Sequence, residues 1–516
     1  MATLAVLSNA GTLPHVQQKT VGVAGRATRK VIGMVEPLWP AGATTPAQGA
    51  TDADPTTPLF AHGFTNLDRE YTDLELPVAG RLPPWLHGRL LRNGPARFVL
   101  PKGAVAHWFD GLAMLHAFTF AHGHVRYSNR FLHSTAYRHA QAQGAPGPSV
   151  FTVDPGASLF RRILTGLFPY QLDNANIAIT QVDGRFLALT ETPQTIAFDP
   201  ATLHTIGAFR FRDRLRGHLT TAHPLYDATT GVSYTYLTRF GLPSRYQIVT
   251  LGTQRRLVGS LPVTAPGYMH SFAMTERYLV LSEFPFLLSL RAIFSAEVPL
   301  IGSFRWRPER ATRFLVLDKH TGALVDTYAA EACFGFHHVN AYESAEGLVL
   351  DLVVYPNPTV IDQFYLATLK QHAPMPAGEL RRYVLPHQGR SAHYTVVSPV
   401  GLELPQIDER QRSRRHRYVY GAGVSQRGAF FDQIVRVDTE QQAAVIWSEN
   451  GCYPGEPIFV PDPSADAEGA GLLLTVVLDG RCGTSFLLVL DATTLVEVGR
   501  ARMAHHIPFG LHGMYV

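Results

Sequence analysis

The sequence Leu487-Leu-Val-Leu-Asp491 is a short apolar run that ends in aspartate, and the same unit recurs along the chain. The other copies are Ile196-Ala-Phe-Asp199, Phe314-Leu-Val-Leu-Asp318 and Ile434-Val-Arg-Val-Asp438. Aspartate suits the first position of a tight turn because its carboxylate can accept hydrogen bonds from the backbone N–H groups that follow. Each unit therefore predicts a strand that turns back into a hairpin.

The spacing of these aspartates predicts a repeated module. Asp199 and Asp318 are 119 residues apart, Asp318 and Asp438 are 120 apart, and Asp438 and Asp491 are 53 apart. These intervals fit one or two modules of about 50–60 residues, close to the size of a four-stranded propeller blade. From about residue 58 onward, short apolar runs alternate with turn residues and helical periodicity is scarce. The pattern favours an all-β propeller over a β-sandwich, for which the chain is long.

Composition narrows the class of protein. Of the 516 residues 46% are apolar, which is enough for a large core, and 17% are charged, against about 25% in average soluble domains. A net charge of +4 is too small for a chain of this length to indicate a nucleic-acid partner. The cysteines, Cys333, Cys452 and Cys482, are too few and scattered for a disulfide framework, so a reducing compartment is the simpler assumption.

Two parts of the chain differ in composition. Residues 1–55 are rich in Ala, Thr, Gly and Pro and contain no acidic residue before Glu36. We expect a disordered leader there, with an organellar transit peptide as the alternative. Residues 56–516 are expected to form a single propeller domain.

Four histidine contexts stand out among the 23 histidines of the chain. They are Thr220-Thr-Ala-His223-Pro224, Tyr268-Met-His270-Ser-Phe, Phe336-His337-His338-Val-Asn340 and Ile507-Pro-Phe-Gly-Leu-His512-Gly513. No two have the close spacing of a helix-borne metal motif, but a closed propeller can gather ligands from distant segments onto its axis. The residues alone leave the choice open between His337 and His338, and leave the pair His505 and His506 ambiguous.

Iron(II) is a suitable metal for such a set because neutral imidazoles bind it and would leave positions open for O₂. Imidazole ligands usually donate their second ring N–H to a carboxylate or a carbonyl group. Glu191, Glu403 and Glu456 are candidates, since each lies in an apolar or Pro-bounded setting where a buried carboxylate would need partners. A solvated strand end is the alternative for each.

These segments resemble the carotenoid cleavage oxygenase family from about Phe64 to the C-terminal residues. The resemblance is carried by Arg92-Asn-Gly-Pro95, His107-Trp-Phe-Asp-Gly111, Asn129-Arg-Phe-Leu-His-Ser134, Phe336-His-His-Val-Asn-Ala-Tyr-Glu343, Leu402-Glu-Leu-Pro-Gln-Ile407, Tyr453-Pro-Gly-Glu-Pro-Ile-Phe459 and His512-Gly513. It implies that the metal ligands are His223, His270, His337 and His512, and that Glu191, Glu403 and Glu456 support them.

The resemblance also implies a seven-bladed β-propeller with Fe(II) on the axis and a lid of loops and helices over one face. The implied activity is cleavage of a C=C bond in a carotenoid or apocarotenoid by O₂, which gives two aldehyde products. Alternatives within the family are a stilbene-cleaving dioxygenase and a retinoid isomerase. A non-catalytic binding propeller is the alternative outside enzymes.

A substrate of this kind lies in membranes, so we expect peripheral membrane contact. Residues 284–294 and 159–168 mix bulky apolar and basic side chains, which could enter one leaflet while the arginines stay at the head groups. The expected contact residues are Phe284, Phe286, Leu287, Leu288, Leu290, Ile293 and Phe294. The basic run from Arg410 to Arg417 is interpreted as a solvated loop, with binding to anionic lipid as the alternative. We expect the chain in the cytoplasm, or in a plastid if the leader is a transit peptide.

Overall fold

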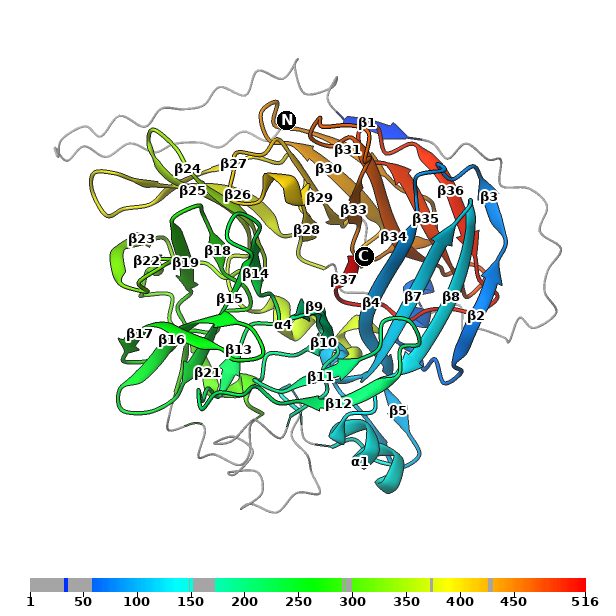
Figure 1. Cartoon of the computed structure of the whole chain (residues 1–516), viewed down its shortest axis with the longest axis horizontal. Coiled ribbons are helices and arrows are strands. Elements are labelled where there is room, and N and C mark those ends of the chain that lie inside the picture. Colours follow the sequence, from blue (N-terminus) through cyan, green and yellow to red (C-terminus); the bar gives the residue numbers. More distant parts are fainter. Residues whose placement is uncertain are drawn as a thin grey trace, which may run out of the picture.

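The computed structural model describes residues 32–35, 58–147, 149–151, 172–289, 292, 299–371, 375–425 and 430–516. In this part of the chain, seven antiparallel sheets of at least four strands surround a common axis as propeller blades (Figure 1). The predicted all-β, seven-bladed propeller is therefore confirmed. We name the blades A to G in chain order.

Blades A to D use the first part of the chain, with each innermost strand given first. Blade A is β37 (Gly513–Tyr515), β4 (Gly88–Arg97), β7 (Leu112–Ala121), β8 (His124–Phe131) and β2 (Tyr71–Leu76). Blade B is β9 (Ala178–Val182), β10 (Arg185–Leu189), β11 (Thr195–Phe198) and β12 (Thr205–Phe209). Blade C is β13 (Leu219–Thr220) and β14 (Leu225–Asp227), then β15 (Val232–Arg239), β16 (Ser244–Leu251) and β17 (Arg256–Val263). Blade D is β18 (Ala273–Met274), β19 (Tyr278–Glu283), β22 (Thr312–Asp318) and β23 (Leu324–Ala330).

Blades E to G complete the ring. Blade E is β24 (His338–Glu343), β25 (Gly347–Val354), β26 (Glu379–Pro386) and β27 (His393–Val396). Blade F is β28 (Glu403–Gln406), β29 (Tyr418–Gly423), β30 (Gln433–Asp438) and β31 (Ala443–Trp447), with β1 (Ile32–Val35) parallel to its edge. Blade G is β32 (Cys452–Pro454) and β33 (Ile458–Pro461), then β34 (Gly471–Asp479), β35 (Thr484–Asp491), β36 (Glu497–Arg502) and β3 (Val78–Gly80). Apart from β1, the predicted leader, residues 1–55, lies outside the described residues.

The repeated aspartates have the predicted position. Asp199, Asp318, Asp438 and Asp491 each stand at the end of the third strand of a blade, B, D, F and G respectively. The Asp491 carboxylate accepts hydrogen bonds from the backbone N–H groups of Thr493 and Thr494, at 3.1 and 2.8 Å. The intervals of about 120 residues span two blades, and the interval of 53 spans one.

The ring is closed by strands from distant parts of the chain. Strand β37 pairs with β4, so that Gly513 lies opposite Arg92, and β3 pairs with β36, so that Val78 lies opposite Ala501. In Figure 1 the red β37 accordingly lies beside the blue β4. The pairing of β37 with β4 brings residues more than 400 positions apart in sequence to the axis, whereas β3 lies at the outer edge of blade G.

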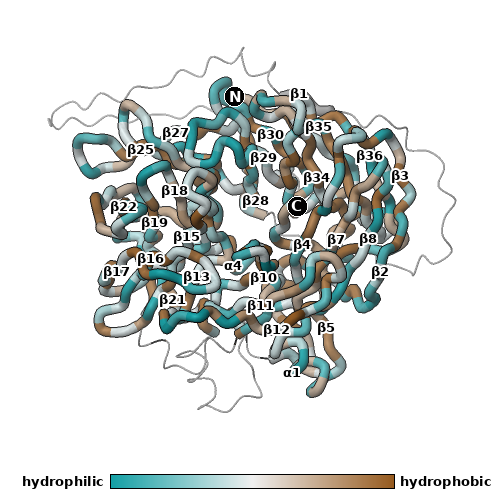
Figure 2. Tube along the Cα trace, viewed as in Figure 1, coloured by the Kyte–Doolittle hydropathy of each residue, from teal (hydrophilic) through white to brown (hydrophobic). Residues whose placement is uncertain are grey.

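The core lies between neighbouring blades. Leu90 and Phe118 of blade A pack with Leu474 and Leu487 of blade G, and similar clusters join C to D and F to G. Figure 2 shows apolar residues along central strands such as β34 and β7. Burial of each large apolar side chain contributes about 1.5–3 kcal/mol, which makes the ring a rigid frame for residues on its axis.

Short elements that belong to none of the blades make up what we call the lid. Its described elements are β5 (Val99–Leu100), β6 (Gly103–Ala104), α1 (Thr135–Gln143), β20 (Phe286–Leu288), β21 (Phe304–Trp306), α4 (Val360–Gln363), α5 (Leu366–Leu369) and the 3-10 helices η3 (Trp108–Asp110) and η5 (Ile301–Ser303). Two further 3-10 helices are η2 (Leu59–Phe64) and η6 (Glu409–Gln411). Within the lid, the backbone N–H of Trp108 donates to the Phe364 carbonyl oxygen at 3.0 Å. None of the helices in the described residues has the length and apolar character needed to cross a membrane.

Part of the predicted membrane contact is wrong. Phe284, Phe286, Leu287 and Leu288 are buried, because β20 pairs with β21 and packs into the main core. The ring of Phe286, for example, contacts those of Tyr268, Phe304 and Phe334. The remaining predicted contacts, Leu290, Ile293 and Phe294, and the segment 159–168 lie outside the described residues.

The basic run is paired with acidic side chains. Arg410 forms an ion pair with Asp408, and Arg412 with Glu409. Arg414, Arg415 and Arg417 pair with Glu276, Glu440 and Asp438 respectively. Since every one of the five arginines has an acidic partner, the run favours the interpretation as a surface loop over a lipid-binding patch.

Candidate metal centre

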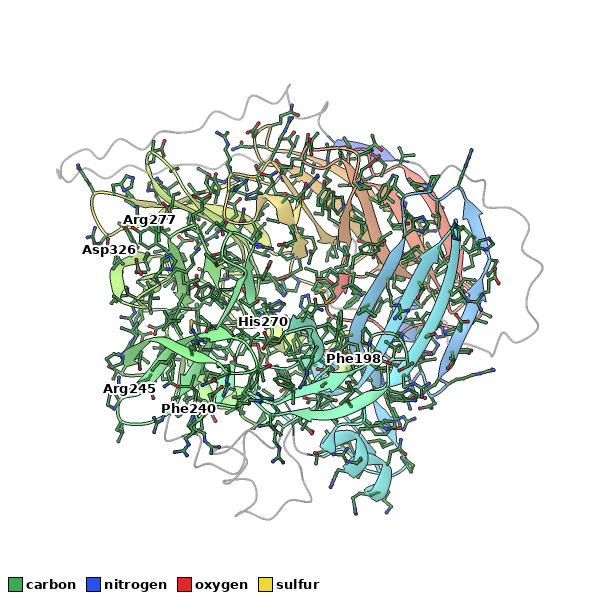
Figure 3. The ribbon with its side chains drawn as sticks, viewed as in Figure 1. Phe198, Phe240, Arg245, His270, Arg277 and Asp326 are labelled. Atoms are coloured by element: carbon green, nitrogen blue, oxygen red, sulfur yellow. The ribbon has the colours of Figure 1, made fainter. Side chains whose placement is uncertain are left out.

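The four predicted histidines meet on the axis of the propeller. His223 lies two residues before β14, His270 three residues before β18, His337 directly before β24, and His512 directly before β37. Each is thus carried at the start of the innermost part of a different blade. In Figure 3, His270 lies near the middle of the ring, whereas Arg245 and Asp326 lie at its periphery.

The ring nitrogens of the four histidines form a compact set. One nitrogen from each lies within 4.8 Å of the others. The His223 and His270 Nε2 atoms are 2.9 Å apart, and those of His337 and His512 are 3.2 Å apart. For ligands about 2.1 Å from a metal, neighbours at right angles lie about 3 Å apart, so the spacing fits one bound cation.

Three buried glutamates hold three of these imidazoles. Glu191 Oε1 lies 2.7 Å from His270 Nδ1, Glu403 Oε2 lies 2.5 Å from His337 Nδ1, and Glu456 Oε1 lies 2.8 Å from His512 Nδ1. The glutamates are only 5%, 3% and 1% exposed, so the alternative of solvated strand ends is excluded. The carboxylates also define the tautomer, because each Nδ1 must carry the proton that it donates.

This tautomer explains why the centre suits a cation. With hydrogen on Nδ1, each of the three Nε2 atoms presents a lone pair toward the axis. Lone pairs about 3 Å apart repel each other unless a positive ion lies between them. The donor set therefore fits a transition metal that accepts neutral imidazole.

The seven predicted site residues are distributed over the seven blades. The histidines come from blades C, D, E and A, and the glutamates from the other three. Glu191 follows β10 of blade B, Glu403 begins β28 of blade F, and Glu456 lies between β32 and β33 of blade G. The axis is the only place where all blades approach each other, which is why such distant residues can form one site.

A further layer of donors surrounds the glutamates. The hydroxyl of Tyr268 donates to Glu191 at 2.8 Å, and that of Tyr355 donates to Glu403 at 3.2 Å. Glu456 accepts from Arg92, from Gln406 Nε2 at 2.9 Å and from the Gly513 N–H at 3.0 Å. The sequence reasoning assigned these donors no role. Arg92, Tyr268 and Gln406 nevertheless lie inside the sequence motifs given above, so those motifs were the available indication that these residues belong to the site.

Burial favours the neutral form of three of the four imidazoles. It lowers the pKa of His223 and of His512 well below the usual value, helped by the neighbouring histidines. Burial also lowers the pKa of His270, although Glu191 opposes this shift. Burial raises the pKa of Glu456, and Arg92 opposes it. Neutral imidazoles are the form that ligates metal.

The other candidate histidines are held away from the metal centre. His338 hydrogen-bonds Ser271 and Ser282 through its two ring nitrogens, both at 2.7 Å. His505 stacks on Tyr71, and His506 hydrogen-bonds Thr65. The choice of His337 over His338 thus matches the geometry of the cluster.

A narrow apolar cavity of about 40 Å³ opens at the histidines. Its lining includes Trp108, Phe109, Phe336, Phe364 and Phe431, together with His270, His337 and His512. A second cavity of about 340 Å³ shares Phe109, Ile177 and Glu191 with the first and extends beneath the lid. The two cavities therefore adjoin each other between the lid and the four histidines, and we call them together the passage; its mostly apolar lining suits a long apolar molecule.

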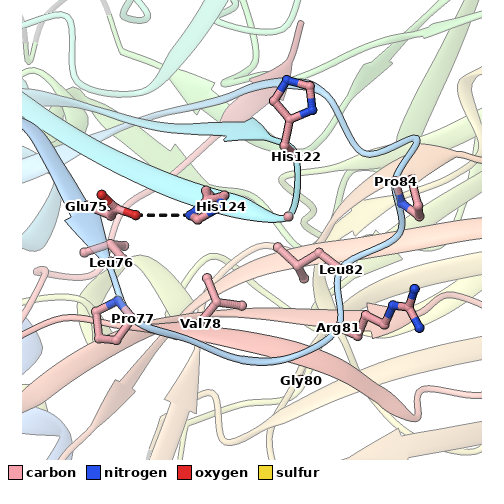
Figure 4. Close-up of a pocket in the computed structure, with 11 residues that line it drawn as sticks. Glu75, Leu76, Pro77, Val78, Gly80, Arg81, Leu82, Pro84, His122 and His124 are labelled. Carbon is pink, nitrogen blue, oxygen red and sulfur yellow. Dashed lines mark hydrogen bonds and ion pairs between the residues drawn. The ribbon is translucent and has the colours of Figure 1, made fainter.

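Two other features do not form comparable sites. Glu449, Cys452 and Asp479 lie close enough to hold a metal, but Arg481 and Arg500 already neutralise the two carboxylates. A polar hollow of about 810 Å³ lies at the outer edge of blades A and G (Figure 4). There His124 pairs with Glu75 at 3.1 Å, and both side chains are more than half exposed.

Comparison with known proteins places this geometry in a family. Residues 64–516 match the family model described as retinal pigment epithelial membrane protein. The chain is 32% identical to the chloroplastic carotenoid cleavage dioxygenase 8 homolog A of Oryza sativa subsp. japonica, over 91% of this chain and 90% of that relative. It is 30% identical to the mitochondrial carotenoid-cleaving dioxygenase of Macaca fascicularis, over 89% and 95% respectively.

A solved structure shows the same fold. The cobalt-substituted apocarotenoid oxygenase of Synechocystis matches with a TM-score of 0.79 and 26% identity. The match covers 89% of this chain and 98% of that protein. That relative therefore shares both the propeller and the overall length of the described domain.

Proposed function

Because this chain belongs to the family of the retinal pigment epithelial membrane protein and the carotenoid cleavage dioxygenases, we propose that it uses iron(II) to cleave a carbon–carbon double bond of a carotenoid or apocarotenoid. The chain is a dioxygenase: one O₂ adds across one C=C bond and two carbonyl groups result, so that atoms balance without another reductant. The observation that carries the iron proposal is the set of four imidazole nitrogens within 4.8 Å of one another.

We propose that His223, His270, His337 and His512 are the metal ligands, and that Glu191, Glu403 and Glu456 orient them. Iron(II), when bound, would supply the position at which O₂ reacts with the polyene. The glutamates fix the imidazole rings and supply negative charge to a site that is otherwise formed by neutral ligands. No side chain is required as a general base, because no proton has to be removed.

The aromatic passage supports a polyene substrate. Trp108, Phe109 and Phe364 offer flat apolar surfaces against which a conjugated chain can lie, and they exclude water from the centre. The position at which the substrate stops in the passage would decide which bond meets the metal. A phenolic stilbene is less well supported, because the hydroxyls of Tyr268 and Tyr355 are already committed to glutamates.

A reconstitution assay tests the proposal. The purified chain is loaded anaerobically with iron(II), then given β-carotene or a shorter apocarotenal in detergent under air, and products are identified by mass. Two complementary aldehydes, absent with His337→Ala, are the expected result and would identify the bond. Bound iron with an intact polyene would indicate an isomerase or a stilbene substrate, and a chain without bound iron would refute the four-histidine site.

We also propose peripheral contact with a membrane, because the substrate partitions into bilayers. Val99 of the lid is 58% exposed, and it lies next to Leu100 and near Lys102, both of which line the larger cavity. An apolar tip beside a lysine suits the boundary between acyl chains and head groups. Flotation with anionic liposomes should retain the wild-type chain and lose Val99→Asp, while equal flotation of both would refute contact at this point.

The cellular location follows as a further proposal. Curated relatives are described as chloroplastic or mitochondrial. We propose a membrane-associated chain in the cytoplasm, or in a plastid if residues 1–55 act as a transit peptide, with residues 56–516 as one catalytic unit. A fluorescent protein fused to residues 1–55 separates the two locations, and limited proteolysis tests whether residues 56–516 persist as one fragment.

A further inference from the structure

Arg92 of β4 reaches the metal centre through Glu456. Its guanidinium group forms an ion pair with Glu456 Oε2, and it also donates to the Leu511 carbonyl oxygen at 3.1 Å. Arg92 is 4% exposed and Glu456 is 1% exposed, so solvent does not screen this pair. Glu456 in turn binds His512 Nδ1, which links the cation to a metal ligand in two steps.

The backbone around Arg92 is shaped to admit this side chain. A methyl group on Gly513 would lie 2.6 Å from Arg92 Cδ and 3.2 Å from its Nη1 atom. Added methyl groups on Gly455 and Gly510 would lie 3.7 Å from Nη2, which is an ordinary van der Waals contact. Gly513 is therefore the glycine that lets the bulky cation lie beside the last ligand.

The three glutamates are therefore not equivalent. Glu191 and Glu403 each accept a hydrogen bond from an uncharged tyrosine hydroxyl. Among the described side chains that contact the three glutamates, Arg92 is the only permanent cation. Arginine stays protonated in proteins, so its charge is fixed across the working pH range.

A charge count gives Arg92 a role. Three ionised glutamates around a divalent metal and four neutral imidazoles leave one excess negative charge in a buried site. Arg92 cancels it, so the ferrous centre as a whole is neutral. Oxidation of the metal to the ferric state would add a positive charge that nothing in this count balances, and a fixed cation nearby makes that step less favourable.

We propose that Arg92 is a positioning residue that acts through Glu456 and His512, and whose charge holds the iron in the ferrous state. This inference rests on the proposed function, since it requires iron at the four histidines. A unit charge at roughly 10 Å, in an interior of effective dielectric about 20, changes the ferric-to-ferrous equilibrium about tenfold. For a one-electron couple that corresponds to about 59 mV.

Four variants of the iron-loaded full chain test this by anaerobic redox titration, with ferric iron followed by electron paramagnetic resonance. Arg92→Gln should lower the midpoint potential by about 59 mV, and Arg92→Lys, which keeps the charge, should leave it close to wild type. Glu456→Gln should raise it by a similar amount. The double variant with both glutamines should return toward the wild-type potential, because it removes both charges.

Arg97→Gln is the matched control, because Arg97 lies on the same strand but pairs with the exposed Asp68. Its potential should equal that of wild type. Equal shifts in Arg92→Gln and Arg92→Lys, or no restoration in the double variant, would overturn the charge role and leave only packing. If Arg92→Gln fails to fold, the rise expected for Glu456→Gln still tests the charge count. A wild-type chain that binds no iron would instead overturn the proposed function.

Discussion

Replacing Glu403 with glutamine would remove one negative charge from the proposed metal centre while the donors around it stay in place. Glu403 Oε2 accepts from His337 Nδ1–H at 2.5 Å and from the Leu404 N–H at 2.7 Å. Its other oxygen accepts from the Tyr355 hydroxyl at 3.2 Å. A glutamine carbonyl can replace the first oxygen, and its amide can donate to Tyr355, whose hydroxyl can rotate to accept. The change is therefore one of charge and not of shape.

The expected loss follows from the type of hydrogen bond. A bond to a charged acceptor contributes about 1.5–3 kcal/mol, and a neutral one contributes about 0.5–1.5 kcal/mol. The His337 bond should therefore weaken by about 1.4 kcal/mol, which is about tenfold in metal affinity. This lies at the low end of the roughly 10–100-fold losses known for outer partners of metal ligands.

Titration of the apo-protein with cobalt(II), followed by visible absorption, measures this affinity without turnover. Glu379→Gln is the matched control, because Glu379 lies in the neighbouring blade E and its side chain is 43% exposed. We expect about tenfold weaker binding for Glu403→Gln and wild-type binding for Glu379→Gln. Equal affinities in all three chains would refute the reasoning that the carboxylate charge strengthens the His337 ligand.

Three further predictions concern stability. Gly513→Ala should lower the free energy of unfolding by about 1–3 kcal/mol and weaken cobalt binding, because its methyl group would lie 2.4 Å from the Leu91 carbonyl oxygen. Gly252→Ala is the control, since its methyl group meets only ordinary contacts. Urea unfolding of both variants measures the difference. Burial lowers the pKa of His116 to about 3 from 6.5, so between these values only the unfolded chain takes up the proton. His116 should therefore lower the free energy of unfolding by about 1.4 kcal/mol for each pH unit below about 6.5. Unfolding measured across this pH range should show a shallower decline for His116→Asn than for the wild type. Cobalt(II) at about 100 times its Kd should stabilise the wild type by about 2.7 kcal/mol in thermal unfolding, with no gain for His337→Ala; a chelator should reverse the effect.

Much of the fold could be predicted from the sequence because the blade is a local structure. The turn after Asp491 is formed by residues two and three positions ahead, so the short unit contains the information that forms it. Repetition of that unit at blade intervals then predicts a ring. The strand pairs that close the ring, such as β4 with β37, depend on residues more than 400 positions apart, and no local pattern reveals them.

The histidines and glutamates of the site could be predicted from the sequence, but the residues that contact the glutamates could not. The histidines and glutamates follow from their contexts and from the family resemblance. Arg92 and Tyr355 were missed as partners because nothing in a strand sequence shows which side chain will lie beneath a ligand from another blade. The predicted membrane contact of Phe286 was wrong for a related reason, since Phe286 is buried. An apolar run next to a basic residue has the same composition whether it packs into the core or faces lipid.

The distribution of one site residue to each blade limits how this ring can change over evolutionary time. Propellers that bind ligands through repeated blades can lose or duplicate a blade and keep a working surface. Here Glu191 of blade B and Glu456 of blade G have no counterpart elsewhere, so the loss of any blade removes a residue that no neighbour replaces. The number of blades is therefore tied to the site, and variation is left to the outer strands and to the lid.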